Sequence, residues 1–125
     1  MDPEIRIIKG TGEKVTGEIF FLGEGEIKPE LLNQRVEGKI IAGGKFSKVA
    51  LKKALALDVA GVVTTDVDED LFNQISAGIN WEIGETCHLT LTLLIVEKQD
   101  LVFFEKNHGK KAIAPLEEKK IYLCP

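Results

Sequence analysis

Residues that could bind a ligand lie where two expected parallel strands end. One pair follows the apolar segment 38–42, and the other group ends the β-branched segment that begins at residue 62. These residues are Gly43, Gly44, Thr64, Thr65 and Asp66. Ligands of open parallel sheets favour the crevice at the carboxyl ends of the strands, so backbone amides, hydroxyls and a carboxylate there can hold a small polar molecule or an anion. Turn formation and capping are the competing, purely structural interpretation.

Known nucleotide-binding patterns do not fit these glycines. A P-loop needs its first glycine after the strand and Ser or Thr after the Gly-Lys pair, whereas Gly38 lies before the strand and Phe46 follows Lys45. The dinucleotide pattern lacks its third glycine. We therefore expect no nucleotide cofactor.

Metal-binding patterns also fail. The acidic run Asp66–Asp70 resembles the start of a calcium loop, but Leu71 occupies the position that needs glycine and Ala77 the position that needs glutamate. Two His and two Cys stand too far apart for a zinc signature. We expect no metal, and we interpret the acidic run as a helix N-terminus.

Cysteine or histidine catalysis has little support. Cys87 and His88 are neighbours on an expected strand, so their side chains point to opposite faces and cannot form a nucleophile–base pair. His108 falls in a late turn, and its spatial partners are not fixed by the sequence. An enzyme is the third hypothesis, which requires His or Cys in a pocket beside an orienting partner.

Length, composition and charge limit the class of protein. The chain has 125 residues, 44% of them hydrophobic and 29% charged, which suits one globular domain over residues 1–125. The net charge of −4, with basic residues scattered among acidic ones, argues against nucleic acid and anionic membranes as partners. Pro125 directly follows a strand-like segment, so a piece of a longer multidomain chain also fits.

We expect a cytoplasmic protein. The acidic start Met1–Glu4 is no signal peptide, and the apolar run Leu89–Val96 is too short to cross a membrane. Cys87 and Cys124 are expected to be free thiols in a reducing compartment.

The strongest structural signal is a strand–helix–strand unit over Val36–Thr65. Gly38–Ala42 is a compact strand, which we expect Gly43-Gly44 to break. Ser47 can cap a helix that ends near Leu57, and a β-branched strand follows. Such a unit implies parallel strands with a right-handed crossover.

The remaining segments complete an α/β domain. We predict strands at Ile5–Ile8, Val15–Leu22, Cys87–Val96, Lys111–Ala114 and Lys119–Leu123, and turns at Lys9–Gly12 and Gly23–Gly25. We predict one helix whose first turn is the acidic run Asp66–Asp70 and another over Asp100–Lys106. The strand that ends at Val96 alternates apolar and polar residues and is expected to be half-buried. The predicted fold is a small sheet with a parallel βαβ core and two or three flanking helices.

Two resemblances follow from these segments. Val36–Gly44, Ala50–Ala54 and Val59–Val63 are similar to part of an uncharacterised bacterial multidomain family with a barrel-sandwich, biotin/lipoyl-like region upstream, a likeness that continues at Thr64–Asp68 and Leu91–Ile95. In this chain Thr64-Thr65 replaces the family's glycine pair, and no biotinyl or lipoyl attachment motif is present. The resemblance implies no activity and no site residues.

The same succession of glycine and apolar segments resembles swivelling β/β/α domains, which include protease-associated domains and phosphohistidine carriers. The carriers place a histidine near the start of a helix, unlike His88 and His108. This resemblance implies a domain of the swivelling β/β/α type.

Three functions are weighed. The first is a non-catalytic docking or swivelling module that contacts other domains or subunits, with a homo-oligomer left open. It requires an exposed apolar patch, for which the candidates are Phe20, Phe21, Trp81, Phe103 and Phe104. The alternative is a small-molecule or anion-binding domain at Gly43-Gly44 and Thr64–Asp66, and the enzyme comes third.

Overall fold

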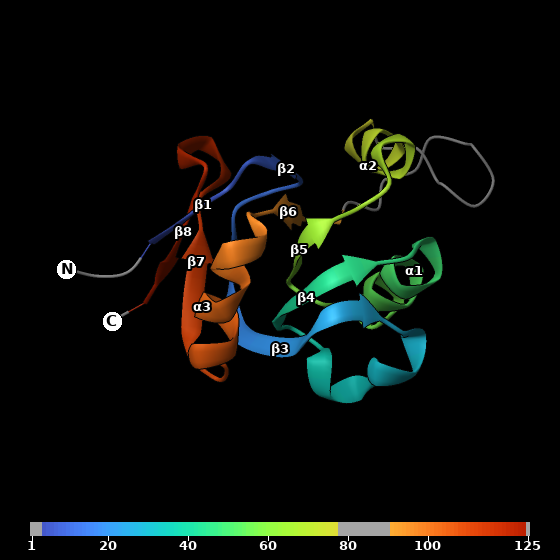
Figure 1. Cartoon of the computed structure of the whole chain (residues 1–125), viewed down its shortest axis with the longest axis horizontal. Coiled ribbons are helices and arrows are strands. Elements are labelled where there is room, and N and C mark those ends of the chain that lie inside the picture. Colours follow the sequence, from blue (N-terminus) through green and yellow to red (C-terminus); the bar gives the residue numbers. More distant parts are fainter. Residues whose placement is uncertain (1–3, 78–90, 125) are drawn as a thin grey trace.

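The computed structural model describes residues 4–77 and 91–124, which form a mixed α/β fold (Figure 1). The strands are β1 (Glu4–Arg6), β2 (Lys9–Thr11), β3 (Val15–Ile27), β4 (Ile40–Phe46), β5 (Gly61–Asp66), β6 (Leu93–Ile95), β7 (Lys111–Ala114) and β8 (Lys120–Leu123). The helices are α1 (Lys48–Ala56), α2 (Glu69–Ser76) and α3 (Leu101–Lys106). Short 3-10 turns lie at η1 (Pro29–Leu31), η2 (Gln34–Val36), η3 (Lys98–Asp100) and η4 (Leu116–Glu118).

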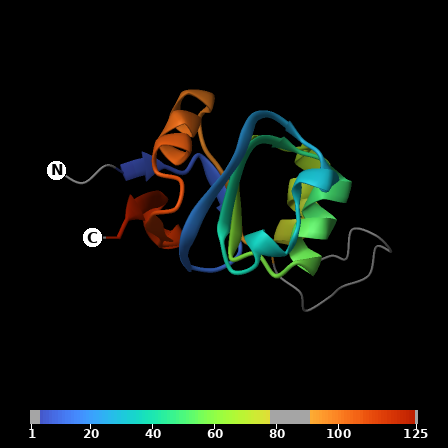
Figure 2. The same ribbon diagram turned by 90° about the horizontal axis from the view of Figure 1, so that it is seen from below.

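The strands form an eight-stranded sheet in the order β1-β8-β7-β3-β4-β5-β6-β2. Its centre, β3 to β6, is parallel, and its flanks are antiparallel. The two edge strands are joined by only Ile7 and Ile8, whose amides donate to Lys119 and Ile95 at 2.8 Å. The sheet therefore curls so that its two edges meet at this link (Figure 2).

Strand β3 joins the two halves of the sheet. Its first residues pair with β7, and its residues from Ile19 onward pair with β4. The predicted end at Leu22 is wrong, since the strand continues through Gly23–Gly25 to Ile27 with shifts of register. The predicted turn at Lys9–Gly12 is also wrong, because Lys9–Thr11 forms β2 against β6.

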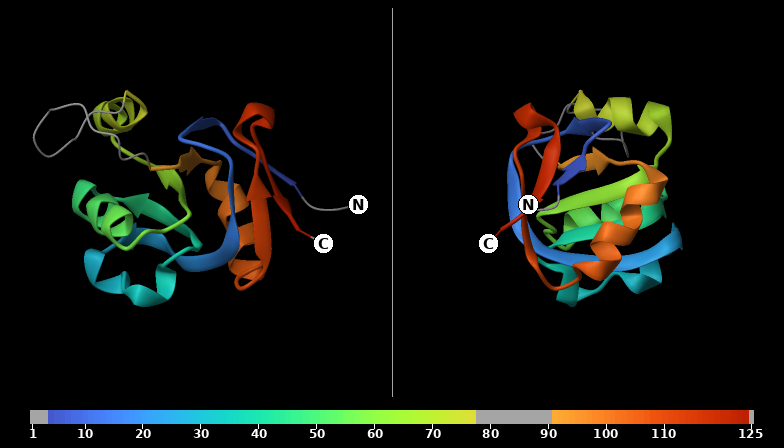
Figure 3. Two further views of the ribbon diagram at one scale, coloured as in Figure 1. Left: turned by 180° about the vertical axis from the view of Figure 1, so that it is seen from behind. Right: turned by 60° about the vertical axis from the view of Figure 1, so that its left-hand side comes forward.

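Two apolar cores fill opposite faces of the sheet. The inner core lies inside the curl and includes Ile19, Ile40, Leu94 and Phe104, to which α3 contributes. The helix core lies between the parallel strands and the helices α1 and α2, and it includes Phe46. Seen from behind, α1 and α2 lie at the opposite end of the molecule from β7 and β8 (Figure 3).

The presence of two cores corrects one prediction. Leu93 and Leu94 in β6 are both fully buried, Leu93 in the helix core and Leu94 in the inner core. The predicted half-buried alternation is therefore wrong for this strand, because neither face of the sheet is left to solvent there. The part of the predicted strand before Leu91 lies outside the described residues.

The strand–helix–strand unit is confirmed. Strands β4 and β5 are parallel neighbours joined by α1, whose N-cap Ser47 accepts from Ala50 N at 3.2 Å and whose C-cap is Leu57. The acidic helix start is also confirmed, since Asp68 caps α2 by accepting from Leu71 N at 3.0 Å. Helix α3 and strands β7 and β8 lie close to their predicted ranges.

None of the four described aromatic residues that were candidates for the predicted apolar patch is exposed. Phe103 and Phe104 are buried in the inner core, while Phe20 and Phe21 are half-buried. Trp81 lies outside the described residues. The large apolar side chains that are exposed in the described part of the chain are Ile8, Leu31, Val49 and Val102. In residues 4–77 and 91–124, no helix has the length and apolar character needed to cross a membrane.

Candidate functional site at the carboxyl ends of the parallel strands

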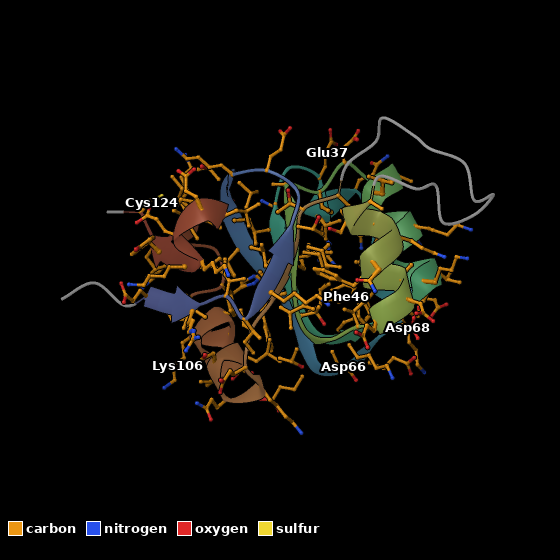
Figure 4. The ribbon with its side chains drawn as sticks, turned by 90° about the horizontal axis from the view of Figure 1, so that it is seen from above. Glu37, Phe46, Asp66, Asp68, Lys106 and Cys124 are labelled. Carbon is orange, nitrogen blue, oxygen red and sulfur yellow. The ribbon has the colours of Figure 1, made fainter. Side chains whose placement is uncertain are left out.

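A pocket of about 390 Å³ opens where β4 and β5 end and α1 and α2 begin. Its lining residues are Lys45, Phe46, Ser47, Lys48, Asp68, Asp70, Leu71 and Gln74. Figure 4 shows Phe46, Asp66 and Asp68 near one another at one end of the layer of α1 and α2, with Glu37 at the opposite end. The pocket therefore occupies the edge of the sheet at which open α/β domains place their ligands.

Local sequence explains why both helices start at this edge. Phe46 ends β4 and buries its ring in the helix core, and Ser47 then caps α1. Strand β5 ends at Asp66, and Asp68 caps α2 two residues later. Because β4 and β5 are parallel, the two strand ends and the two helix starts lie side by side.

The charges that line the pocket divide between its two walls. The β4–α1 wall supplies Lys45 and Lys48, and the α2 wall supplies Asp68 and Asp70. Lys45 Nζ lies 3.8 Å from a carboxylate oxygen of Asp66, and both side chains are more than half exposed, so this pair is weak. In the described part of the chain, no ion pair engages the Lys48 ammonium or the Asp70 carboxylate.

The predicted glycines lie inside the sheet and not at its end. Gly43 and Gly44 are buried within β4, so the predicted break after Ala42 is wrong. A Cβ on Gly44 would overlap the carbonyl oxygen of Glu24, where the irregular part of β3 crosses β4. Gly44 is thus needed for the close approach of two backbones, whereas a Cβ on Gly43 would meet the side chain of Ile27. The strand runs on to Phe46.

The other predicted residues adjoin the glycines, as expected from their positions on neighbouring strands. The buried Thr64 hydroxyl lies 3.0 Å from Gly44 O and 3.1 Å from Asp66 O, and the Thr65 hydroxyl donates to Gly44 O at 2.7 Å. Gly43 pairs with Thr64, and Lys45 pairs with Asp66. The structure therefore brings all five predicted residues together, but none of the five lines the pocket. The threonine hydroxyls bond to backbone oxygens of Gly44 and Asp66, and the Asp66 carboxylate lies beside Lys45.

Sequence reasoning assigned none of the lining residues to a ligand site, although it placed Ser47, Asp68 and Asp70 at the starts of helices. Ser47 is predicted to cap a helix and the acidic run Asp66–Asp70 to form a helix N-terminus. In the structure Ser47 caps α1, and Asp68 caps α2. Each cap also marks a strand's carboxyl end, and this signal would have placed the site two to four residues later in each segment.

His108 has a clear structural partner outside the pocket. Its Nδ1 accepts the amide of Phe21 at 3.0 Å, and its ring packs edge-on against Phe20 with centroids 5.1 Å apart. The imidazole thus bonds to β3 beyond the last residues that pair with β7. Cys87 and His88 lie outside the described residues. Residues 4–77 and 91–124 contain no group of three His, Cys, Asp or Glu side chains that could hold a metal.

Comparisons with known proteins identify a similar fold. No protein-family model matches the chain, and no curated protein does. Among solved structures, the chain is similar to a UPF0107 protein determined in solution by NMR, with a TM-score of 0.59, 16% identity and 100% of each chain covered. At this identity the likeness shows the fold alone. The α/β fold with a parallel core and flanking helices is confirmed.

Proposed function

We propose that this chain is a non-catalytic binding module whose site is the pocket between the starts of α1 and α2. The observation that carries the proposal is the position of this pocket at the carboxyl ends of two parallel strands. Its volume of about 390 Å³ falls in the range that small molecules occupy. This proposal moves the strand-end site expected from Gly43-Gly44 and Thr64–Asp66 outward to the residues that follow them.

The lining chemistry supports binding of a polar molecule. Ser47 and Gln74 offer hydrogen-bonding groups, and lysine and aspartate side chains stand on opposite walls. Of the lining residues that the structure describes, none is a histidine or a cysteine, the side chains that the enzyme hypothesis requires. A binding role follows more directly from this lining than a catalytic one.

A thermal-shift screen tests the proposal. Amino acids, carboxylates, phosphorylated metabolites and amines would be added to the intact chain, because a ligand at a hundred times its dissociation constant adds about 2.7 kcal/mol to stability. Gln74→Trp fills the pocket from the exposed face of α2, and Asn73→Trp, the exposed neighbour that does not line it, is the matched control. We expect a shift that Gln74→Trp abolishes and Asn73→Trp preserves. A flat screen, or a shift that survives Gln74→Trp, would contradict the proposal.

Docking to another protein surface is the second candidate. Val49 and Leu31 are 60% and 46% exposed. Val49 lies on α1 and Leu31 on η1. Lys53, one turn after Val49 on α1, joins these two elements, because its Nζ donates to Pro29 O at 2.9 Å. This small apolar surface, and not the predicted aromatic patch, is where we propose that a partner domain or a second copy would dock. The proposed kinship with the uncharacterised multidomain family would supply such partner domains.

Self-association is the form of docking that can be measured directly. Sedimentation velocity over a range of concentrations would compare the chain with the double variant Leu31→Asp, Val49→Asp. The control is Val102→Asp, an exposed apolar residue of α3. A dimer lost only in the double variant is expected if a second copy docks there, whereas a monomer at every concentration would contradict it.

A further inference from the structure

We infer that the pocket takes a zwitterionic ligand, a molecule with an anionic group and a cationic group separated by a short apolar body. This inference rests on the proposed binding function and names the class of ligand for the same site. It depends on the arrangement of charges around the pocket.

The two walls of the pocket carry opposite charges that do not reach each other. Lys48 belongs to the first turn of α1 and Asp70 to the first turn of α2. Both line the pocket, and within residues 4–77 and 91–124 neither enters an ion pair. Neither charge is engaged by another side chain in the described part of the chain, so both are available to a ligand.

The balance of charge argues against a simple anion or a simple cation. Among the described residues, the lining contains two lysines and two aspartates, so their formal charges cancel. An anion drawn to Lys48 is repelled by Asp70, and a cation drawn to Asp70 is repelled by Lys48. A molecule with both charges satisfies both walls, provided that its carboxylate or phosphate faces α1 and its ammonium faces α2.

Between the charged walls the pocket is apolar. Phe46 and Leu71 are both buried residues of the helix core, and each contributes to the lining. Methylene groups between the two charged ends of a ligand would contact these side chains, and removing their apolar surface from water would favour binding. Asp68 contributes less to the cationic end, because one carboxylate oxygen already accepts the Leu71 amide at 3.0 Å.

Unbranched amino acids of increasing length test the inference. Glycine, β-alanine, γ-aminobutyrate and ε-aminocaproate carry the same two charges at growing separation. Each would be titrated into the isotope-labelled chain and followed by amide proton–nitrogen correlation spectra, beside the carboxylate and the amine of matching length. We expect one member of the series to bind at least about threefold more tightly than both of its singly charged analogues, with shifts at residues of the pocket.

Charge-neutral variants assign each end of the ligand. Lys48→Gln and Asp70→Asn should each weaken binding of the preferred amino acid about two- to fivefold, as exposed charge pairs do. Asp70→Asn should not weaken binding of the matching carboxylate. Glu69→Gln, on the same exposed turn but outside the lining, is the control and should bind like the unmodified chain.

The outcomes separate this inference from the function on which it rests. Equal affinity of the pocket for amino acids and carboxylates would contradict the inference of a zwitterionic ligand, and it would still support the proposed binding function. Equal losses in Lys48→Gln, Asp70→Asn and Glu69→Gln would also overturn it, because the effect would then be general. Absence of any ligand from the pocket in the wider screen would overturn both.

Discussion

At Gly44 the backbone of β4 passes too close to β3 to leave room for a side chain. A Cβ there would overlap the carbonyl oxygen of Glu24 and lie 2.7 Å from that of Gly25. Both neighbours are backbone atoms, which cannot swing away as a side chain can. In the sequence, the glycine pair between an apolar strand and a helix cap is a candidate for anion binding or for a turn. In the structure the pair lies inside β4, where Gly44 allows β3 to approach closely.

We predict that Gly44→Ala destabilises the fold by about 1–3 kcal/mol, because β3 and β4 must move apart. Gly25→Ala is the matched control, since its Cβ would meet nothing within 4 Å. Urea unfolding of the two variants beside the unmodified chain checks this. Equal stability of Gly44→Ala and Gly25→Ala would contradict the close approach.

The hydroxyls of Thr64 and Thr65, which the sequence suggests as ligand-binding groups, also have a structural role. Both hydroxyls donate hydrogen bonds to the carbonyl oxygen of Gly44, at 3.0 and 2.7 Å, and Thr64 is fully buried. Hydroxyls at the end of a strand are typical of ligand sites, but these two satisfy a buried backbone acceptor. A ligand would have to displace that bond before it could use them.

Among the elements, β1 is held to β8 by pairing of its three residues and by an ion pair at the surface. Lys120 Nζ lies 3.1 Å from a carboxylate oxygen of Glu4, and the two residues come from strands at opposite ends of the sequence. The hydrogen bond and charge of Glu4 raise the pKa of Lys120 above its ordinary 10.5. A raised pKa of a cationic group favours folding while the group is protonated.

We therefore predict that this pair loses its contribution to stability in alkaline solution. The contribution is fully present below the ordinary pKa of lysine and disappears as the pH rises through the higher pKa of the folded state. Urea unfolding midpoints of the unmodified chain and Glu4→Gln would be compared at about pH 8 and about pH 11.5. The difference between them should shrink at the higher pH, whereas Glu117→Gln, an exposed control on η4, should show no such trend. A constant difference for Glu4→Gln would contradict the assignment.

The element scale also shows which local signals suffice. Helix α1 begins at the residue after Ser47, as the capping signal predicts, and buries Ala50, Leu51 and Ala54. Helix α2 follows its acidic start in the same way. The limits of β3 could not be found locally, because a strand is continued or ended by its partners, and those partners are distant in sequence.

Across the whole molecule, the central strands tie the two cores together. Ile40 points to the inner core and Ile41 to the helix core, and β5 and β6 alternate in the same manner. Neither core can be exposed without breaking strands that also form the other. This connection is consistent with the expected single domain over residues 1–125, which stays a prediction.

We predict one cooperative unfolding transition. Leu51→Ala in the helix core and Leu94→Ala in the inner core should each cost about 2–5 kcal/mol and shift the same transition. Scanning calorimetry would show equal calorimetric and van't Hoff enthalpies for both variants. Two separate transitions, each sensitive to only one of the substitutions, would contradict a single domain.

The sequence by itself determined the features that depend on near neighbours in the chain. The strand–helix–strand unit, the caps at Ser47 and Asp68 and the α/β class follow from apolar periodicity and from side chains that bond within a few residues. Only the tertiary structure decided the rest. Gly44 is buried because Glu24 lies over it, Leu94 is buried because a second core covers its face, and the pocket exists because two helix starts meet at one sheet edge. Each of these depends on contacts between segments far apart in the chain, and the local periodicity of the sequence does not indicate which distant segments will meet.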